Sequence, residues 1–359
     1  MNNDEIVILS GNDALSLLTG REFEIMDTVQ QAYQTHAQGS SSLPHSTFLN
    51  FPGEPRNRII ALPAFLGESF QVAGMKWIAS FPANREAGLD RASAVLILNS
   101  TRTGRPQAVI EGSIISAKRT AASAALAAGY LHHGLESSQI GLIGCGLINL
   151  EVARFLLASQ PGIRRLLVFD INNDNARQFK ARAGELLHPV EIEIASDMNS
   201  VLRECSLISM ATTAIEPHIH DISLCPPGTT VLHVSLRDFS PEVILSCDNF
   251  VDDIDHVCRA RTSVHLAESQ TGSRSFIRGT LADVVMGRCS RSAPEAKVIF
   301  SPFGLGILDL AVGKLVCDLA QEEGRGQIIH SFLPAPWTGT VEREAGVTKP
   351  AAQKLSASA

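Results

Sequence analysis

The most constraining feature of this chain is a series of short apolar runs separated by segments of helix length. The series begins near Gln139 and reads IGLIG, RRLLVFD, VEIEIA, SLISMATT, TTVLHVS and NFVDD. Such uniformly apolar runs are typical of parallel strands that are buried on both faces, and the spacers have the length of connecting helices. The pattern predicts an α/β fold with a doubly wound parallel sheet, which we place at residues 118–304.

The residues before this series predict a second domain of the α+β type. A helical pattern extends from Glu22 to about Ala37, and an alanine-rich stretch predicts a connecting helix over residues 114–131. Three further runs are typical of strands, at residues 58–62, 73–78 and 94–98. A helical pattern from about Gly304 to Ala320 is expected to return to this domain, which would then be discontinuous and comprise residues 1–117 and 305–335.

Composition excludes several classes of function. The chain has 359 residues, 45% of them hydrophobic and 19% charged, which is enough to bury the cores of two domains. A formal net charge of −7 without any basic run argues against a nucleic-acid partner and favours a small molecule. The seven cysteines are scattered without a CxxC pair, which favours reduced thiols over a disulfide framework or a zinc site.

The ends of the chain bear on its location. The N-terminal residues lack the pattern of a signal peptide, and no apolar stretch is long enough to cross a membrane, so we expect a cytoplasmic protein with no membrane partner. Residues 336–359 are rich in Pro, Thr, Ala and Ser and are expected to form a mobile tail.

A glycine-rich turn follows the first apolar run, where residues 141–149 read GLIGCGLIN before an expected helix. Gly144 would permit the tight turn, and Gly146 would let the backbone approach a pyrophosphate at the N-terminus of the helix. This is the Rossmann-type arrangement, although Asn149 stands where the fingerprint has its third glycine. The residues predicted to bind the dinucleotide here are Gly144, Cys145, Gly146, Leu147 and Ile148.

The end of the second apolar run supports the same interpretation. Asp170 stands where a carboxylate accepts hydrogen bonds from the adenosine ribose. No Arg or Lys follows until Arg177, so nothing nearby would favour a 2′-phosphate, and NAD is predicted rather than NADP. The alternative is an ordinary tight turn in which Asp170 caps the next helix.

Polar residues follow two other runs, where a doubly wound sheet places its ligand. Thr212 and Ser235 are predicted to contact the cofactor, and Asp238 lies just beyond, between a strand and the next helix. That is a usual location for a catalytic carboxylate, but Asp238 or Ser240 would equally serve as a helix cap.

Two cations and a histidine pair are further candidates. Lys76 lies in an apolar strand, where an ammonium group must find an anion, undergo a lowering of its pKa or snorkel to solvent. Arg119 would begin the alanine-rich helix and is either a clamp for a substrate carboxylate or a surface residue paired with Glu111 or solvent. The His218-Ile219-His220-Asp221 segment lacks further ligands at a suitable spacing, and no metal is expected.

Taken together, these segments resemble the ornithine cyclodeaminase/μ-crystallin family over roughly residues 5–325. The resemblance is carried by the Lys76 strand, the RTAASA helix segment, the Gly144-Cys145-Gly146 turn and the loop around Asp238. RIIALP, GMKWI, RASAVLILN and IGCGLI are most similar to the branch of NAD-dependent dehydrogenases that act on N-(2-amino-2-carboxyethyl)-L-glutamate in L-2,3-diaminopropionate biosynthesis, as found in siderophore pathways. By this resemblance Lys76 and Asp238 are catalytic, Lys76 and Arg119 bind substrate with Arg119 on its α-carboxylate, and Arg58 and Arg91 hold further carboxylates.

The sequence also departs from the cyclodeaminases themselves. They carry two glycines before the aspartate and Cys-Pro-Gly-Lys after it, whereas this chain has Leu236-Arg237 before Asp238 and Phe239-Ser240-Pro241-Glu242 after it. Oxidation of an amino-acid C–N bond is therefore expected, with cyclodeamination, ketimine reduction or another amino-acid dehydrogenation as alternatives. A crystallin-like protein that binds dinucleotide without turnover is a further alternative. The resemblance also implies a homodimer that pairs through the N-terminal domain.

Overall fold

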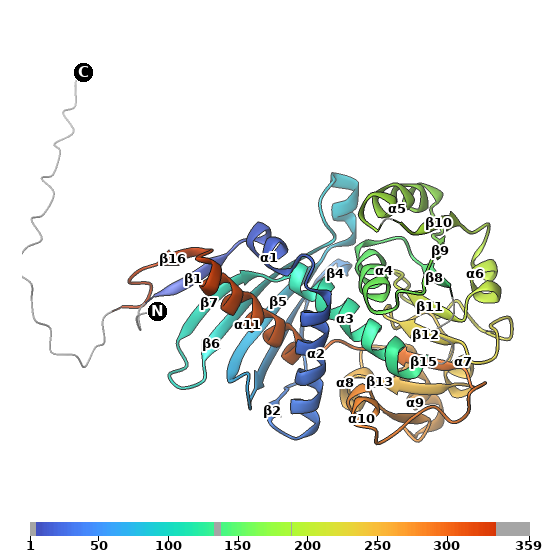
Figure 1. Cartoon of the computed structure of the whole chain (residues 1–359). Helices are drawn as coiled ribbons and strands as arrows, with labels where there is room; N and C mark the ends of the chain where they lie inside the picture. Colours follow the sequence, from blue (N-terminus) through green and yellow to red (C-terminus); the bar gives the residue numbers. More distant parts are fainter. Residues whose placement is uncertain (1–4, 133–137, 188, 335–359) are drawn as a thin grey trace, which may run out of the picture.

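The computed structural model describes residues 5–132, 138–187 and 189–334, and two sheets organise them (Figure 1). One sheet is built from the N-terminal third of the chain and its C-terminal strand, and the other from the middle of the chain. The predicted fold class is confirmed, because the second sheet is parallel throughout and the first is a separate, mostly antiparallel sheet with helices on it.

The parallel sheet has the strand order β10-β9-β8-β11-β12-β15-β13-β14. Its strands are β8 (Gln139–Ile143), β9 (Arg165–Phe169), β10 (Glu191–Ile194), β11 (Leu207–Met210), β12 (Thr230–His233), β13 (Asp248–Val251), β14 (Ile277–Thr280) and β15 (Val298–Ser301). The order reverses beside β8, where the chain runs outward on one side through β9 and β10 and on the other through β11 and β12. In open α/β sheets this reversal is the place where ligands bind, at the carboxyl ends of the strands.

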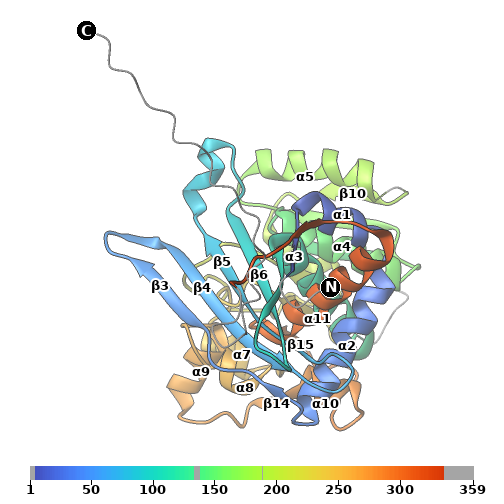
Figure 2. The ribbon, with the colours of Figure 1, turned by 90° about the vertical axis from the view of Figure 1, so that its left-hand side faces the viewer.

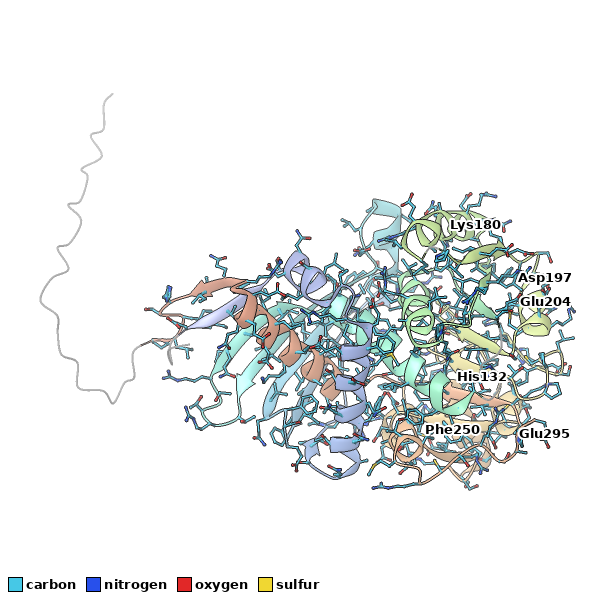
Figure 3. All side chains as sticks on the ribbon, in the orientation of Figure 1. His132, Lys180, Asp197, Glu204, Phe250 and Glu295 are labelled. Atoms are coloured by element: carbon cyan, nitrogen blue, oxygen red, sulfur yellow. The ribbon has the colours of Figure 1, made fainter. Side chains whose placement is uncertain are left out.

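Helices connect these strands and cover the sheet. They are α4 (Leu147–Ser159), α5 (Asn173–Leu186), α6 (Met198–Glu204), α7 (Pro241–Leu245), α8 (Ile254–Val257), α9 (Ser263–Thr271) and α10 (Leu281–Val285). Figure 3 shows Phe250 of β13 inside this half of the molecule, whereas Lys180, Asp197, Glu204 and Glu295 lie at its margin. The interior is thus mostly apolar, and these four charged side chains lie on the surface, as the hydrophobic effect favours.

The N-terminal sheet has the strand order β16-β1-β7-β6-β5-β4-β2, and β3 pairs with β4. Its strands are β1 (Ile6–Leu9), β2 (Ser41–Ser42), β3 (Thr47–Phe51), β4 (Glu54–Leu66), β5 (Val72–Ser80), β6 (Ala92–Ser100), β7 (Pro106–Glu111) and β16 (Gln327–Ile329). Its helices are α1 (Gly11–Leu18), α2 (Glu22–Ala37), α3 (Ser113–Leu131) and α11 (Gly306–Glu323), and a 3-10 turn spans Pro82–Ala87. Figure 2 shows the hairpin of the short strand β3 and the long strand β4, drawn above α7 and α9 of the other half.

The two faces of the N-terminal sheet differ in burial. Lys76 is in register with Leu62 and Leu96, and this row is buried beneath α11 and α3. The neighbouring row contains Trp77 and Val95, which are 39% and 41% exposed. Because side chains alternate across a strand, adjacent residues of β5 thus occupy a closed interior and an open surface.

Helix α11 returns from the parallel sheet and packs on β4, β5 and β6. A β-carbon added at Gly306 would lie 2.9 Å from the Leu62 carbonyl oxygen, so glycine lets the helix begin directly against β4. This approach brings the first turn of α11 over the buried row that contains Lys76.

The structure extends the predicted elements. The three expected N-terminal strands are longer than the apolar runs. No prediction was made for β1, β2, β3, β7, β14, β15 and β16. The predicted domain boundaries stay a prediction, and the predicted tail at 336–359 lies outside the described residues. Within the described parts of the chain, no helix is both long and apolar enough to span a membrane.

Candidate functional site

The glycine-rich turn lies between β8 and α4, at the reversal of strand order. Gly144 has φ +92°, and an added β-carbon would lie 2.5 Å from the Ala211 carbonyl oxygen, so glycine is required there. Gly146 precedes α4, whose first turn has no side-chain cap and no acidic residue. The N–H groups at the start of α4 therefore keep their capacity to bind a phosphate.

Asn149 fits this turn, although a glycine was expected there. The side chain is fully buried, and its Nδ2 donates hydrogen bonds to the carbonyl oxygens of Ile143 at 2.9 Å and Gly144 at 2.7 Å. Its Oδ1 accepts a hydrogen bond from Ser209 Oγ at 2.7 Å. Asn149 therefore joins the glycine-rich turn to β11 and supplies a hydrogen-bond donor to the Gly144 carbonyl, while the Ile143 carbonyl also accepts from the Ala211 amide.

Asp170 lies at the carboxyl end of β9, beside the same turn. Its Oδ2 accepts a hydrogen bond from the Cys145 amide at 2.8 Å, and its Oδ1 accepts one from the Asn172 amide at 2.9 Å. The cap of α5 is Asn172, which accepts from the Asp174 amide, so Asp170 is not the helix cap that was considered as an alternative. The adjacent Ile171 is 96% exposed, an apolar surface next to the expected ribose position.

Asp238 is the centre of a buried hydrogen-bonded cluster. It is fully buried, and it accepts hydrogen bonds from the hydroxyl groups of Thr212 and Ser235. Its Oδ2 lies 3.1 Å from Nε2 of His233, whose Nδ1 lies 3.2 Å from Ser301 Oγ. Thr212 and Ser235, predicted to contact the cofactor, thus have their hydroxyl groups directed at the carboxylate.

These donors decide the ionisation of Asp238. Burial raises its pKa, but the hydrogen bonds from His233, Ser235 and Thr212 together with the charge of His233 outweigh burial and hold the pKa at about 2. The carboxylate is therefore charged at neutral pH. The alternative that Asp238 caps the next helix is not observed, since Ser240 is the N-cap of α7 and makes no side-chain cap hydrogen bond.

A second buried cluster joins β5, α3 and α11. Asp309 Oδ2 accepts a hydrogen bond from Lys76 Nζ at 2.6 Å, and its Oδ1 accepts one from Arg119 Nε at 3.1 Å. Lys76 also donates to Ser116 Oγ at 3.0 Å. Lys76, Arg119 and Asp309 are 2%, 7% and 0% exposed, so two cations share one carboxylate away from water.

The structure supplies Lys76 with an anion, as expected, and excludes the exposed position that was the alternative for each cation. Lys76 does not snorkel, because it points to the covered face of the sheet; burial and the charge of Arg119 lower its pKa to about 8 despite Asp309. Arg119 does not begin its helix, which starts at Ser113, and it is neither exposed nor paired with Glu111. Glu111 instead accepts hydrogen bonds from the first amides of α3.

Asp309 and His233 were not predicted as site residues from the sequence. Asp309 is a single acidic residue in the apolar segment GLGILDLAVG, the same signal that singled out Lys76. His233 likewise ends an apolar strand beside predicted site residues. Only the fold shows that each is the partner of a residue that had been predicted.

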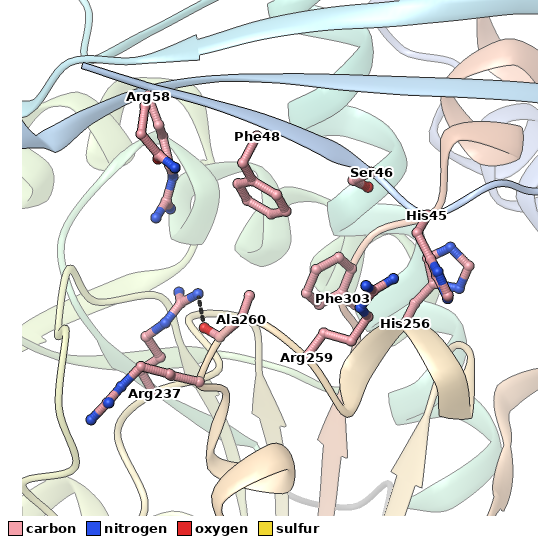
Figure 4. Close-up of a pocket in the computed structure, with 11 residues that line it drawn as sticks. His45, Ser46, Phe48, Arg58, Arg237, His256, Arg259, Ala260 and Phe303 are labelled. Atoms are coloured by element: carbon pink, nitrogen blue, oxygen red, sulfur yellow. Dashed lines mark hydrogen bonds between the residues drawn. The ribbon is translucent and has the colours of Figure 1, made fainter. Parts of the chain in front are cut away.

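Of the other two predicted arginines, Arg58 lines a cleft between the two halves (Figure 4), whereas Arg91 is not among the residues that line it. Arg58 and Arg237 line it, and burial together with the charges of Arg58 and Arg91 lowers the pKa of Arg237. Arg91 donates from Nε to Ser80 Oγ at 3.3 Å. The cleft adjoins both clusters, because Arg237 precedes Asp238 and the lining residue Phe303 precedes Gly304, whose backbone lies against the Arg119 guanidinium.

The two histidines of the possible metal segment are separated by the fold. His218 Nε2 lies 3.9 Å from Asp238 Oδ1, whereas His220 lines another cavity with Glu242. Ile219 between them is buried and pairs with Phe239. Among the described residues, no group of three or more His, Cys, Asp or Glu side chains is arranged to hold a metal ion.

Comparison with known proteins identifies relatives over nearly the whole chain. The family model of the ornithine cyclodeaminase/mu-crystallin family matches residues 13–324. The N-((2S)-2-amino-2-carboxyethyl)-L-glutamate dehydrogenase of Staphylococcus aureus is 25% identical over 338 residues, which cover 92% of this chain and 100% of the relative.

Solved structures agree with the fold. The Δ(1)-pyrroline-2-carboxylate reductase of Thermococcus litoralis, in complex with NADH and L-proline, has a TM-score of 0.84 and 26% identity, covering 90% of this chain and 99% of that one. An archaeal alanine dehydrogenase dimer with bound NAD has a TM-score of 0.81 and 26% identity, with the same coverage of 90% and 99%.

Proposed function

Since the chain belongs to the ornithine cyclodeaminase/mu-crystallin family, as its motifs had indicated, we propose that it is an NAD-dependent oxidoreductase acting on the C–N bond of an amino acid with several carboxylates. The favoured substrate is N-(2-amino-2-carboxyethyl)-L-glutamate, which would be oxidised and hydrolysed to L-2,3-diaminopropionate and 2-oxoglutarate. The observation that supports this choice is the number of cations, with Lys76 and Arg119 in one cluster and Arg58 in the adjoining cleft.

The residues of the glycine-rich turn fit NAD. Gly144 allows the close turn, and the first amides of α4 have no side-chain cap. Asp170 places a carboxylate at the expected ribose position, which favours a ribose hydroxyl over a 2′-phosphate. Gly144, Cys145, Gly146, Leu147 and Ile148 would hold the pyrophosphate and Asp170 the adenosine ribose. NAD, when bound, accepts the two electrons and the hydrogen that leave the substrate carbon.

Lys76 and Arg119 would position the substrate. The two cations share one carboxylate, so the cluster keeps a net positive charge that a substrate α-carboxylate neutralises. With a pKa of about 8, Lys76 also exchanges a proton near neutral pH, as deprotonation of the substrate nitrogen requires. Arg58 and Arg91 would hold the other carboxylates.

Asp238 would serve the hydrolytic half of the reaction. Because it is charged at neutral pH, it stabilises the positive imine carbon and nitrogen formed by the oxidation. A water molecule becomes strongly acidic as it bonds to that carbon, so a carboxylate of low pKa suffices to accept its proton. Thr212, Ser235 and His233 fix the orientation of this carboxylate and act as positioning residues.

The direct test is NADH formation by the purified protein with NAD and N-(2-amino-2-carboxyethyl)-L-glutamate. L-Ornithine and L-alanine are the parallel substrates, and Δ(1)-pyrroline-2-carboxylate with NADH tests the reductive direction. Turnover of the tricarboxylate alone supports the proposal, and preference for any other substrate overturns it. Asp238→Asn should retain NADH binding and lose turnover, whereas a protein that only binds dinucleotide would have no turnover to lose.

We also propose that the chain forms a homodimer through the open face of its N-terminal sheet. Leu49, Trp77 and Val95 are exposed on β3, β5 and β6, and Trp77 and Val95 are paired neighbours. An apolar sheet face of this kind is typical of an interface with a second copy. The proposed division of labour is that residues 1–117 with 305–335 bind substrate and dimerise, while 118–304 bind NAD.

A further inference from the structure

The cleft between the two halves has a distinctive charge. It encloses about 530 Å³, and the described residues that line it include Arg58, Arg237, Arg259 and Arg261 but no aspartate or glutamate. The chain as a whole is acidic, with a formal net charge of −7. Four guanidinium groups without a carboxylate therefore make this cleft a local site for anions.

The charges of the cleft are compensated only in part, since Arg237 interacts with the charge of Asp238, whereas burial alone shifts the pKa of Arg58. Arg58 projects from β4 towards Arg237 on the opposite wall (Figure 4). The Arg58 Nε is buried without a hydrogen-bond partner, and burial lowers the pKa of this guanidinium. An anion between Arg58 and Arg237 would supply the missing acceptor and relieve the repulsion of the two like charges.

The far wall of the cleft is held in a strained backbone conformation. Leu236, Ala260 and Arg261 have φ of 70°, 53° and 55°, the left-handed region that residues with a β-carbon seldom adopt. Two hydrogen bonds cross between these segments, from Arg237 Nη2 to the Ala260 carbonyl at 2.8 Å and from the Ser263 amide to the Leu236 carbonyl at 2.7 Å. Strain maintained by such cross-links is typical of ligand clamps.

We propose that Arg237 and Arg259, together with Arg58, bind a side-chain carboxylate of the substrate and make the enzyme select dicarboxylates and tricarboxylates over monocarboxylates. The site rests on the proposed function for the identity of the substrate, but selection between dianions and monoanions is testable without turnover. Arg237 contributes specificity because it reaches the cleft from the residue next to Asp238, while Lys76 and Arg119 occupy the adjoining cluster.

The test compares the binding of 2-oxoglutarate and pyruvate by calorimetry, since these 2-oxo acids differ in the distal carboxylate. We expect wild type to bind 2-oxoglutarate at least about tenfold more tightly, the effect of one charge-assisted bidentate contact. Arg237→Gln should bring the two dissociation constants close together by weakening 2-oxoglutarate only, and Arg237→Lys should restore part of the difference. A structural role alone would weaken both ligands.

Two further variants control the experiment. Arg259→Gln changes an exposed side chain, so it should fold normally and still reduce the preference for 2-oxoglutarate. Arg325→Gln removes an arginine beyond the end of α11, where it pairs with Glu323, and should leave the preference unchanged. Equal binding of both ligands by wild type, or an unchanged preference in Arg237→Gln and Arg259→Gln, would overturn the proposal.

The outcomes separate this site from the proposed reaction. A preference for 2-oxoglutarate that falls in Arg237→Gln supports the carboxylate site even if wild type does not oxidise N-(2-amino-2-carboxyethyl)-L-glutamate, which would overturn only the substrate. Turnover of that tricarboxylate with an unchanged KM in Arg237→Gln would overturn the role of Arg237 and leave the proposed function standing.

Discussion

Replacing Asp309 by asparagine tests the buried charge cluster most directly. Asp309 is fully buried and is the acceptor for Lys76 at 2.6 Å and for Arg119 at 3.1 Å. Asparagine keeps the size of the side chain but leaves two buried cations without an anion. Removing one partner of a buried ionic group costs about 3–5 kcal/mol, so Asp309→Asn should lower the free energy of unfolding by about that amount.

A matched control lies on the same helix. Asp318 pairs with Lys314 at 2.6 Å, and the two side chains are 51% and 38% exposed. Exposed pairs contribute roughly 0.2–1 kcal/mol, so Asp318→Asn should be nearly neutral. Urea unfolding of wild type and both variants, followed by circular dichroism, gives the comparison. If the free energies of unfolding of Asp309→Asn and Asp318→Asn differ by less than about 1 kcal/mol, the buried cations do not need the Asp309 carboxylate and the reasoning is wrong.

The same variant has a consequence for pH dependence. The pKa of Lys76 is already lowered to about 8, chiefly by burial and then by Arg119, while Asp309 opposes the change. Without Asp309 the pKa should fall further, so Lys76 loses its proton at a lower pH. The alkaline limit of substrate binding should therefore move to lower pH in Asp309→Asn, measured as log(kcat/KM) against pH.

Three further predictions concern separate parts of the molecule. The pKa of Asp238 is lowered from 3.8 to about 2, so its charge stabilises the fold above pH 3.8 by about 2 kcal/mol, and this contribution is lost as the pH falls through about 2. The difference in unfolding free energy between wild type and Asp238→Asn should shrink over that interval, and a constant difference would contradict the assignment. Asn149→Ala should weaken NADH binding, measured by fluorescence titration, because the Gly144 carbonyl loses the Asn149 donor and the glycine-rich turn loses its link to Ser209; unchanged affinity would show that the turn holds its shape alone. If the proposed homodimer forms, Trp77→Asp should convert it to a monomer in light scattering, whereas Leu186→Asp on the exposed side of α5 should not; a wild type that is itself monomeric would contradict the proposal.

Local sequence pattern was sufficient for six of the eight strands of the parallel sheet and for the cofactor turn. The strands β11 and β12 are buried on both faces, so their composition identifies them without knowledge of their neighbours, whereas the edge strand β10 exposes Glu191 and Glu193. The spacing of the glycines indicates the backbone geometry of the turn, and Asp170 follows the turn by only one helix and one strand. The strands β14 and β15 were missed because each is short and follows a segment without a clear helical period.

The partners of the predicted site residues depended on tertiary structure. Lys76, Arg119 and Asp309 come from β5, α3 and α11, and only the return of α11 onto the N-terminal sheet brings the carboxylate to the two cations. The strand pattern marked Lys76 as an anomaly but did not indicate which face of the sheet it occupies. That face is decided by which side the helices cover.

The sequence by itself determined the fold class, the family and the residue types available for chemistry, because these depend on local composition and spacing. Tertiary structure alone decided that Thr212, Ser235 and His233 hold Asp238 charged, and that Arg58 and Arg237 face each other across one cleft. Charges and hydrogen bonds act over a few ångströms, whereas Thr212 lies 26 positions from Asp238 and Arg58 lies 179 positions from Arg237 in the chain. Only the folded packing of the two sheets sets those distances.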